Sequence, residues 1–322
     1  MLLIDIARVS DQVAATPARN AKVGLLADAV GSLDLAELPI GVAYLAGTVP
    51  QGSFGVGYAT LRELPPPARD ATLILVEVDR ALSTAVEISG EGSTAARRDV
   101  IDSVFSRATA EEQDFLAALL LEGLRQGASE RLMMDAIAKA FGVPPTLVRR
   151  AAMFTGEVAE VAVAAADGRG AVEAIGLELF RPVLPMLAKT AGSVDEGLEK
   201  VGVAAVDRKL DGARIQVHLH EGEVRVFTRN LNDVTDRVPE VVEAVARFPA
   251  SALVLDGEAI GIRTDGRPVP FQVTMGRFGS EGSEHTLELS PFFFDLLHVD
   301  GDDFLDLPLR ERVDRLDRIV PE

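Results

Sequence analysis

The spacing of apolar residues changes near Phe180, and this change divides the chain into two regions that must fold differently. Before it, apolar residues recur at helical intervals; after it, they alternate with polar residues, as in a strand with one buried face. A length of 322 residues suits two cores better than one. The sequence predicts an all-α domain over residues 1–176, followed over 177–322 by a mainly antiparallel-sheet (α+β) domain.

The helical region carries recognisable start and stop signals. Thr109 with Glu112 has the spacing of a capping box, and Ser129 is a second expected N-cap. Pro144-Pro145 should begin another helix, since proline is tolerated in a first turn. A break is expected at Asp167-Gly168, inside an alanine-rich stretch.

In the second region, the alternation predicts strands in "ARIQVHLH" and, after the turn "HEGE", in "EVRVFTR". We expect a strand pair around Asp256-Gly257 and an apolar strand ending at Asp300-Gly301. Pro182 and Pro185 indicate that an extended connector leads into this region.

Composition excludes several classes of protein. No run of 18 apolar residues could span a membrane, and the N-terminus lacks the pattern of a signal peptide. With no cysteine, the chain has no disulfide and no thiolate metal site or nucleophile, so we expect a cytoplasmic protein. The net charge of −18 argues against a nucleic-acid partner, unless a local arginine patch is offset by acids elsewhere.

One lysine, Lys209, is the only lysine in residues 201–322, where the other basic side chains are arginines. It lies two residues before Asp211-Gly212. Because Asp-Gly between alternating runs is a strong hairpin signal, a plain turn explains this stretch without any function. The competing interpretation is a covalent nucleophile, and the residues alone leave both open.

As a nucleophile, Lys209 would need a neutral amine, which neighbouring cations such as Arg208 and Arg214 favour. The planar fork of Arg214 also suits phosphate oxygens. Asp211 could orient the amine or a metal, and Gly212 could allow the backbone to approach a ligand closely. The spacing Lys-x-Asp-Gly-x-Arg is that of covalent nucleotidyltransferases.

Further motifs follow in order, and together they resemble those of ATP-dependent DNA ligases of the archaeal and actinobacterial type. The similar segments are "RPVLPMLA", "KLDGAR", "FTRN", "LDGEAIG", "PVPFQVTMGRFG" and "FFFDLLHVDG". The helical half, including "LPIGVAYLAG" and "STAARRDVIDSVFSRATAEEQDFLAALLLEGLRQGA", resembles the DNA-binding domain that precedes the adenylation domain of these ligases.

The resemblance implies a reaction in which the amine of Lys209 attacks ATP to give a lysyl-AMP. The adenylate then activates the 5′-phosphate of nicked double-stranded DNA, and the 3′-hydroxyl seals the strand. Implied ligand contacts are Asp207 to adenine, Arg214 to ribose or phosphate, Arg229 to the nucleotide or broken strand, Glu258 to ribose or Mg²⁺, Phe294 stacked on adenine, and Arg125, Gln126 and Gly127 to the DNA backbone.

The sequence also departs from the family pattern. Asp207 stands where the family typically has Glu, and "EGLRQGA" replaces "GELRQGA". The chain ends at Glu322, before the later adenylation motifs and the OB domain, so we expect an N-terminal fragment, a monomer impaired in self-adenylylation. The alternatives are a non-catalytic nick-binding or duplex-binding protein with a vestigial adenylation half, and an RNA ligase or guanylyltransferase-like enzyme.

Overall fold

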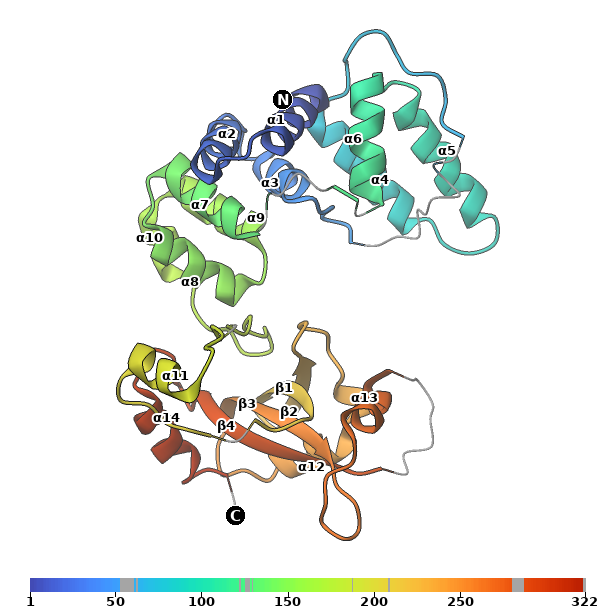
Figure 1. The fold of residues 1–322 in the computed structure, drawn as a ribbon. Helices are drawn as coiled ribbons and strands as arrows, with labels where there is room; N and C mark the ends of the chain where they lie inside the picture. Colours follow the sequence, from blue (N-terminus) through green and yellow to red (C-terminus); the bar gives the residue numbers. More distant parts are fainter. Residues whose placement is uncertain are drawn as a thin grey trace. The chain divides into compact units, whose positions relative to one another are not determined.

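The computed structural model describes residues 1–52, 61, 63–121, 123–124, 128, 130–186, 188–207, 209–279 and 287–320. The chain forms two compact units, Met1–Gly176 and Leu177–Glu322. The first unit is helical and the second is built on one sheet (Figure 1). The expected change from helices to an antiparallel sheet is confirmed.

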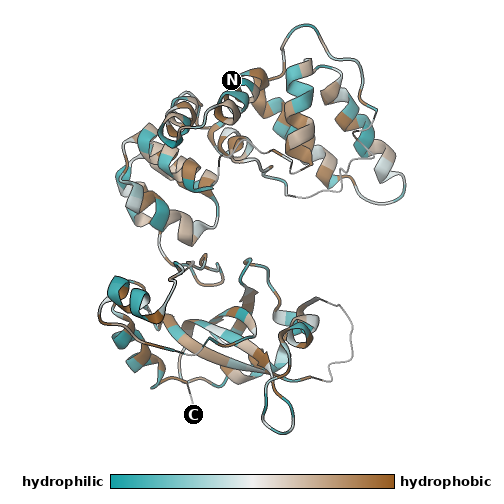
Figure 2. Cartoon of the chain, viewed as in Figure 1, coloured by the Kyte–Doolittle hydropathy of each residue, from teal (hydrophilic) through white to brown (hydrophobic). Residues whose placement is uncertain are grey.

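The first unit packs its helices around one hydrophobic core, whose largest fully buried side chains include Tyr44, Phe105 and Leu116. Figure 2 shows hydrophobic and hydrophilic residues mixed along these helices, as expected when each buries one face. The helices are α1 (Leu3–Ala15), α2 (Arg19–Gly31), α3 (Leu38–Ala46), α4 (Leu75–Glu87), α5 (Ser93–Phe105), α6 (Ala110–Leu120), α7 (Glu130–Phe141), α8 (Pro145–Thr155), α9 (Val158–Asp167) and α10 (Arg169–Ala174).

The helix ends follow the signals in the sequence. Thr109 Oγ1 accepts from the amide of Glu112 at 3.4 Å, and Glu112 Oε2 accepts from the amide of Thr109 at 2.8 Å, which confirms the capping box. Pro145 begins α8, and Gly168 separates α9 from α10. Ser129, the other expected cap, lies outside the described residues.

The second unit contains a five-stranded sheet of order β2-β1-β3-β4-β5 in which all neighbours are antiparallel. The expected alternation is confirmed, because Ile215, Val217 and Leu219 point to one face and join a single core. The strands are β1 (Ala213–His220), β2 (Glu223–Thr228), β3 (Ala252–Gly261), β4 (Leu289–Val299) and β5 (Asp302–Asp303).

Three helices contribute to that core, through Val241 and Val245 of α12, Phe278 of α13 and Leu316 of α14. The helical segments of this unit are α11 (Val194–Val201), a 3₁₀ helix (Thr235–Arg237), α12 (Pro239–Val245), α13 (Phe271–Gly279) and α14 (Leu309–Leu316). Within the described ranges of the whole chain, no helix is long and apolar enough to cross a membrane. The other face of the sheet carries polar residues of β1, and the candidate site lies there.

Not every Asp-Gly pair of the second unit forms the turn that its sequence predicts. Asp300-Gly301 does turn the chain between β4 and β5. The expected strand pair around Asp256-Gly257 is wrong, because both residues lie inside the single strand β3. A β-bulge against β4 falls between them, and a Cβ on Gly257 would lie 2.6 Å from the carbonyl oxygen of Phe292. Close backbone approach, rather than a turn, therefore requires this glycine.

The plain-hairpin interpretation of Asp211-Gly212 is also wrong. The hairpin between β1 and β2 turns at Glu221-Gly222, as "HEGE" predicted, whereas Asp211-Gly212 precedes β1. A Cβ on Gly212 would lie 2.5 Å from the carbonyl oxygen of Ala259. Gly212 therefore lets the segment that carries Lys209 pack closely on β3.

Candidate nucleotide site

Lys209 lies on an exposed segment that runs into β1. Its Nζ donates to the carbonyl oxygen of Leu210 at 3.2 Å. Arg208, one of the two cations expected beside it, lies outside the described residues. Asp207 is exposed on the same segment. The amine is therefore accessible to a ligand from solvent.

Glu258 connects this segment to the sheet. It lies opposite Arg214 in the register of β1 and β3, and its Oε1 accepts from the amide of Gly212 at 3.1 Å. Burial raises the pKa of the Glu258 carboxyl, while the hydrogen bond from Gly212 and the charges of Lys209 and Arg214 act to lower it. Lys209, Arg214 and Glu258 thus share one electrostatic environment, as a nucleotide site requires.

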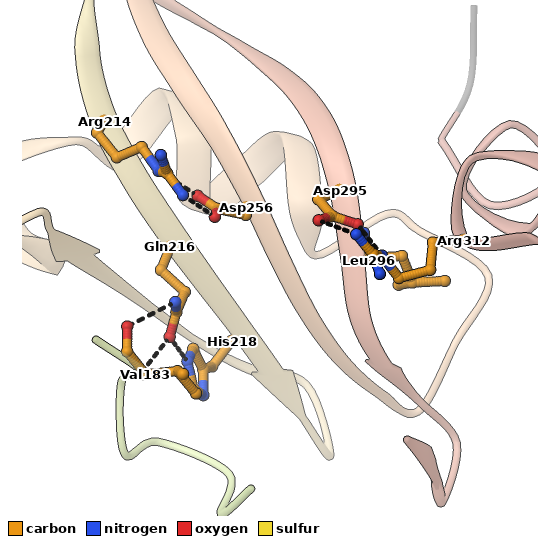
Figure 3. A network of polar contacts seen from close by, with 8 residues as sticks. All are labelled: Val183, Arg214, Gln216, His218, Asp256, Asp295, Leu296 and Arg312. Atoms are coloured by element: carbon orange, nitrogen blue, oxygen red, sulfur yellow. Dashed lines mark hydrogen bonds and ion pairs between the residues drawn. The ribbon is translucent and has the colours of Figure 1, made fainter. Parts of the chain in front are cut away.

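Arg214 is held by the carboxylate of Asp256, which was not among the predicted site residues. Its Nε donates to Asp256 Oδ1 at 2.6 Å and its Nη2 donates to Oδ2, which makes a two-pronged ion pair (Figure 3). Burial raises the pKa of Asp256, and the bonded Arg214 opposes that rise. The sequence motif Asp-Gly predicts a turn at Asp256 and not a role in a site. The feature that could have indicated such a role is a charged residue within the apolar run "LVLDGEAIG".

A second carboxylate–guanidinium pair lies on the neighbouring strand. Asp295 is the β4 partner of Asp256, and it accepts from Arg312 of α14 at 2.7 and 3.0 Å (Figure 3). Two carboxylates at adjacent positions repel each other, and the proximity of Asp295 indeed acts to raise the pKa of Asp256. Each carboxylate is balanced by its own arginine, so the charges of β3 and β4 are compensated locally.

The aromatic residues of β4 flank this site. The guanidinium of Arg214 lies 5.2 Å from the ring centroid of Phe294, in a cation–π contact. Phe292 is opposite Glu258 in the register and is exposed. The structure therefore brings Phe294, the expected adenine platform, next to Arg214, and it adds Phe292 to the same region.

Arg229 joins Arg214 at a small open pocket. The lining residues come from four segments: the connector before the sheet, strand β1, the end of β2 with the residue that follows it, and strand β3. They are Val183, Pro185, Arg214, Gln216, Thr228, Arg229 and Asp256. Two guanidinium groups at one pocket suit a phosphate-bearing ligand. Both arginines were predicted site residues, whereas no role in the site was predicted for the connector or for Gln216.

Two further expectations from the sequence concern the contacts to DNA and a bound metal ion. Arg125, Gln126 and Gly127, the expected contacts to DNA, lie outside the described residues. Among the residues with described positions, no group of three or more His, Cys, Asp or Glu side chains could enclose a metal ion. Within the described part of the chain, Glu258 is therefore not part of a cage of three such ligands.

The fold of the chain, a helical unit followed by an open antiparallel sheet, is also that of the solved structure Pmar-Lig_PreS3. The two share 19% identity with a TM-score of 0.55, over 90% of this chain and 56% of that one. Two family models match the sequence: DNA ligase N terminus over residues 51–138 and ATP dependent DNA ligase domain over residues 185–322. The chain belongs to the ATP-dependent DNA ligase family.

Curated relatives agree with this assignment. The chain is 47% identical over 327 residues to a probable DNA ligase of Streptomyces griseus, covering 100% of this chain and 64% of the relative. It is 49% identical over 331 residues to a probable DNA ligase of Anaeromyxobacter dehalogenans, again covering 100% of this chain and 64% of the relative. The chain therefore spans about two-thirds of the length of these relatives.

Proposed function

We propose that this chain carries out the nucleotidyl-transfer chemistry of an ATP-dependent DNA ligase, with Lys209 as the nucleophile. The observation that supports this most directly is the convergence of Lys209, Arg214 and Glu258. Glu258 accepts a hydrogen bond from the amide of Gly212, three residues after Lys209. Its carboxylate also interacts electrostatically with the positive charges of Lys209 and Arg214. Family membership supports ATP as the nucleotide.

In the proposed first step, the neutral amine of Lys209 attacks the α-phosphorus of ATP. A nitrogen–phosphorus bond forms, the bond to the pyrophosphate leaving group breaks, and the amine loses a proton. The adenylate then moves to the 5′-phosphate of a nick, and the 3′-hydroxyl displaces AMP. Arg214, already oriented by Asp256, is suited to hold ribose or phosphate without reorganising.

The remaining site residues take the roles implied by the family. Each has a contact or position on the same unit that supports the role, apart from the three DNA-contacting residues outside the described ranges. The proposed contacts are Asp207 to adenine, Phe294 stacked on adenine, Arg229 to the nucleotide or the broken strand, Glu258 to a ribose hydroxyl or Mg²⁺, and Arg125, Gln126 and Gly127 to the DNA backbone.

The site could hold a magnesium ion only if the substrate supplied some of its ligands. Mg²⁺ in phosphoryl-transfer sites is usually held by one or two carboxylates together with substrate phosphates and water. Glu258 supplies one carboxylate, and the described residues offer no cage of three acidic or histidine ligands. Glu258 would therefore share the ion with the phosphates of ATP, and the ion would neutralise phosphate charge.

The chain is further proposed to act as a monomer in the cytoplasm on nicked duplex DNA. Transfer of label from the α-phosphate of ATP to Lys209 tests the proposal. A chain that binds nicked duplex but never acquires label would instead be a non-catalytic DNA-binding protein.

A further inference from the structure

The connector Phe180–Pro185 is bound to the sheet through its main chain. The amide of Val183 donates to Gln216 Oε1 at 2.7 Å, and the carbonyl oxygen of Val183 accepts from Gln216 Nε2 at 3.2 Å (Figure 3). Gln216 is a buried polar residue of β1, on the face of the sheet that carries Arg214. One side-chain amide thus satisfies both polar groups of a connector residue, as a neighbouring strand would.

His218 fixes the other end of the connector. Its Nδ1 accepts from the amide of Phe180 at 2.9 Å, so the ring proton must be on Nε2, which then donates to Gln216 Oε1 at 3.0 Å. Burial, helped by the nearby His298, lowers the pKa of His218 to about 3. The neutral ring that this bonding pattern requires is therefore the form present at neutral pH.

Phe180 adopts a backbone conformation that needs such support. Its φ is 66°, in the left-handed region, which is strained for a residue other than glycine. The Phe180 ring contacts the guanidinium of Arg225, 4.8 Å from the ring centroid, and the ring of His220, with 6.1 Å between centroids. These contacts and the bond to His218 specify one position for the start of the connector.

The held connector forms one wall of the pocket that contains the two arginines. Val183 and Pro185 line it from the connector, and Arg214 and Arg229 line it from the sheet and the end of β2. Gln216 belongs to both the pocket and the contact with Val183. Thr228 also lines the pocket, and its Oγ1 is buried with no hydrogen-bond partner among the described residues.

We propose that Gln216 and His218 are positioning residues that hold Phe180–Pro185 as the second wall of the arginine pocket, and that they thereby set its affinity for the phosphates of a nucleotide. The choice of ATP as ligand rests on the proposed function. The attachment of the connector to the sheet does not rest on the proposed function, since it follows from the contacts of Val183 and Phe180 alone. An experiment can therefore contradict the effect on ATP affinity without contradicting the attachment, and the reverse.

The attachment is tested by the rate at which a unique thiol is labelled, since the chain contains no cysteine. Val183→Cys places a thiol at a residue that is 4% exposed, so its labelling requires the connector to open. Adding Gln216→Met keeps the side-chain length but removes both bonds to Val183. Labelling of Val183→Cys should then become about tenfold faster or more, because both hydrogen bonds that hold Val183 are lost.

Two further thiols make the result specific. Met186→Cys, at a residue 85% exposed, gives the rate of an unprotected connector thiol. Val226→Cys lies in the core on the other face of the sheet and should stay slow when Gln216→Met is added. Equal rates at Val183→Cys with and without Gln216→Met would overturn the proposal. Acceleration at both Val183→Cys and Val226→Cys would also overturn it, because Gln216 would then only stabilise the fold.

The link to the pocket is tested by ATP binding to the chain without added cysteines, measured by isothermal titration calorimetry. Gln216→Met should raise the Kd for ATP about tenfold, whereas the exposed control Arg247→Ala should leave it unchanged. A loosened connector with unchanged ATP affinity would overturn the link. Absence of ATP binding by the wild-type chain would overturn the proposed function and the affinity part together, while the thiol rates would still decide the attachment.

Discussion

The carboxylate of Asp256 holds the guanidinium of Arg214 across strands β1 and β3, with Arg214 Nε donating at 2.6 Å. The two side chains are 11% and 34% exposed, respectively. The same guanidinium lies over the ring of Phe294 and lines the pocket with Arg229. Asp256 therefore fixes the orientation of an arginine of the site before any ligand binds.

Replacing Asp256 by alanine should destabilise the second unit by about 2–3 kcal/mol, because the guanidinium of Arg214 loses a largely buried partner. Urea unfolding followed by circular dichroism measures this cost. Glu243→Ala is the matched control, since Glu243 pairs with Arg247 in the same unit at side-chain exposures of 73% and 77%. The control should change stability by at most about 0.5 kcal/mol. Equal costs for the two variants would contradict a structural role for the Arg214–Asp256 pair.

Glu258 should make stability depend on pH in a specific direction. Burial raises its pKa above the ordinary value of 4.5, so the folded chain binds this proton more tightly than the unfolded chain does. That contribution is fully present below pH 4.5 and is lost as the pH rises through the raised pKa. Glu258→Gln does not titrate, so its free energy of unfolding should increase relative to wild type as the pH rises from 4 to 7. A difference that decreased over this interval would contradict the assignment.

Gly257 should tolerate no side chain. A Cβ there would meet backbone of β4 at 2.6 Å, and backbone cannot move aside without breaking the β3–β4 register. We expect Gly257→Ala to cost about 2–3 kcal/mol in unfolding free energy, as for other overpacked sites. Gly276→Ala is the control, because a Cβ at this position in α13 meets no atom within 4 Å. It should be neutral or stabilising by up to about 1 kcal/mol. A neutral Gly257→Ala would show that the strands can separate locally.

Much of this architecture follows from local sequence signals. The capping residues Thr109 and Glu112, the alternation around Val217 and the lysine ahead of Asp-Gly are each legible without a structure. The roles of Asp256 and Gln216 could not be predicted in this way, because each depends on a distant partner. Asp256 pairs with Arg214, 42 residues away, and Gln216 bonds to Val183, 33 residues away. A turn propensity is local, whereas the strand that places Asp256 beside Arg214 is decided by pairing across the sheet.

Binding to DNA should depend steeply on salt despite the net charge of −18. Contacts to phosphates release counterions, so the affinity for nicked duplex should fall by about a hundredfold or more between 50 and 200 mM salt if several phosphates are contacted. Fluorescence anisotropy with a nicked duplex measures this, and Arg229→Ala should weaken the binding. An affinity that does not change with salt would mean that the overall acidity of the chain prevails over any local basic surface.

The central claim is that Lys209 is the nucleophile, and self-adenylylation tests it most directly. The chain is incubated with Mg²⁺ and ATP labelled at the α-phosphate, and the modified residue is located by mass spectrometry of its peptides. Lys209→Ala is compared with Lys200→Ala, in which an exposed lysine of α11 paired with Glu196 is removed. We expect transfer of AMP to Lys209 in the wild type and in Lys200→Ala, and none in Lys209→Ala. Label that persists in Lys209→Ala, or a wild-type chain that never acquires label, would show that Lys209 is not the nucleophile.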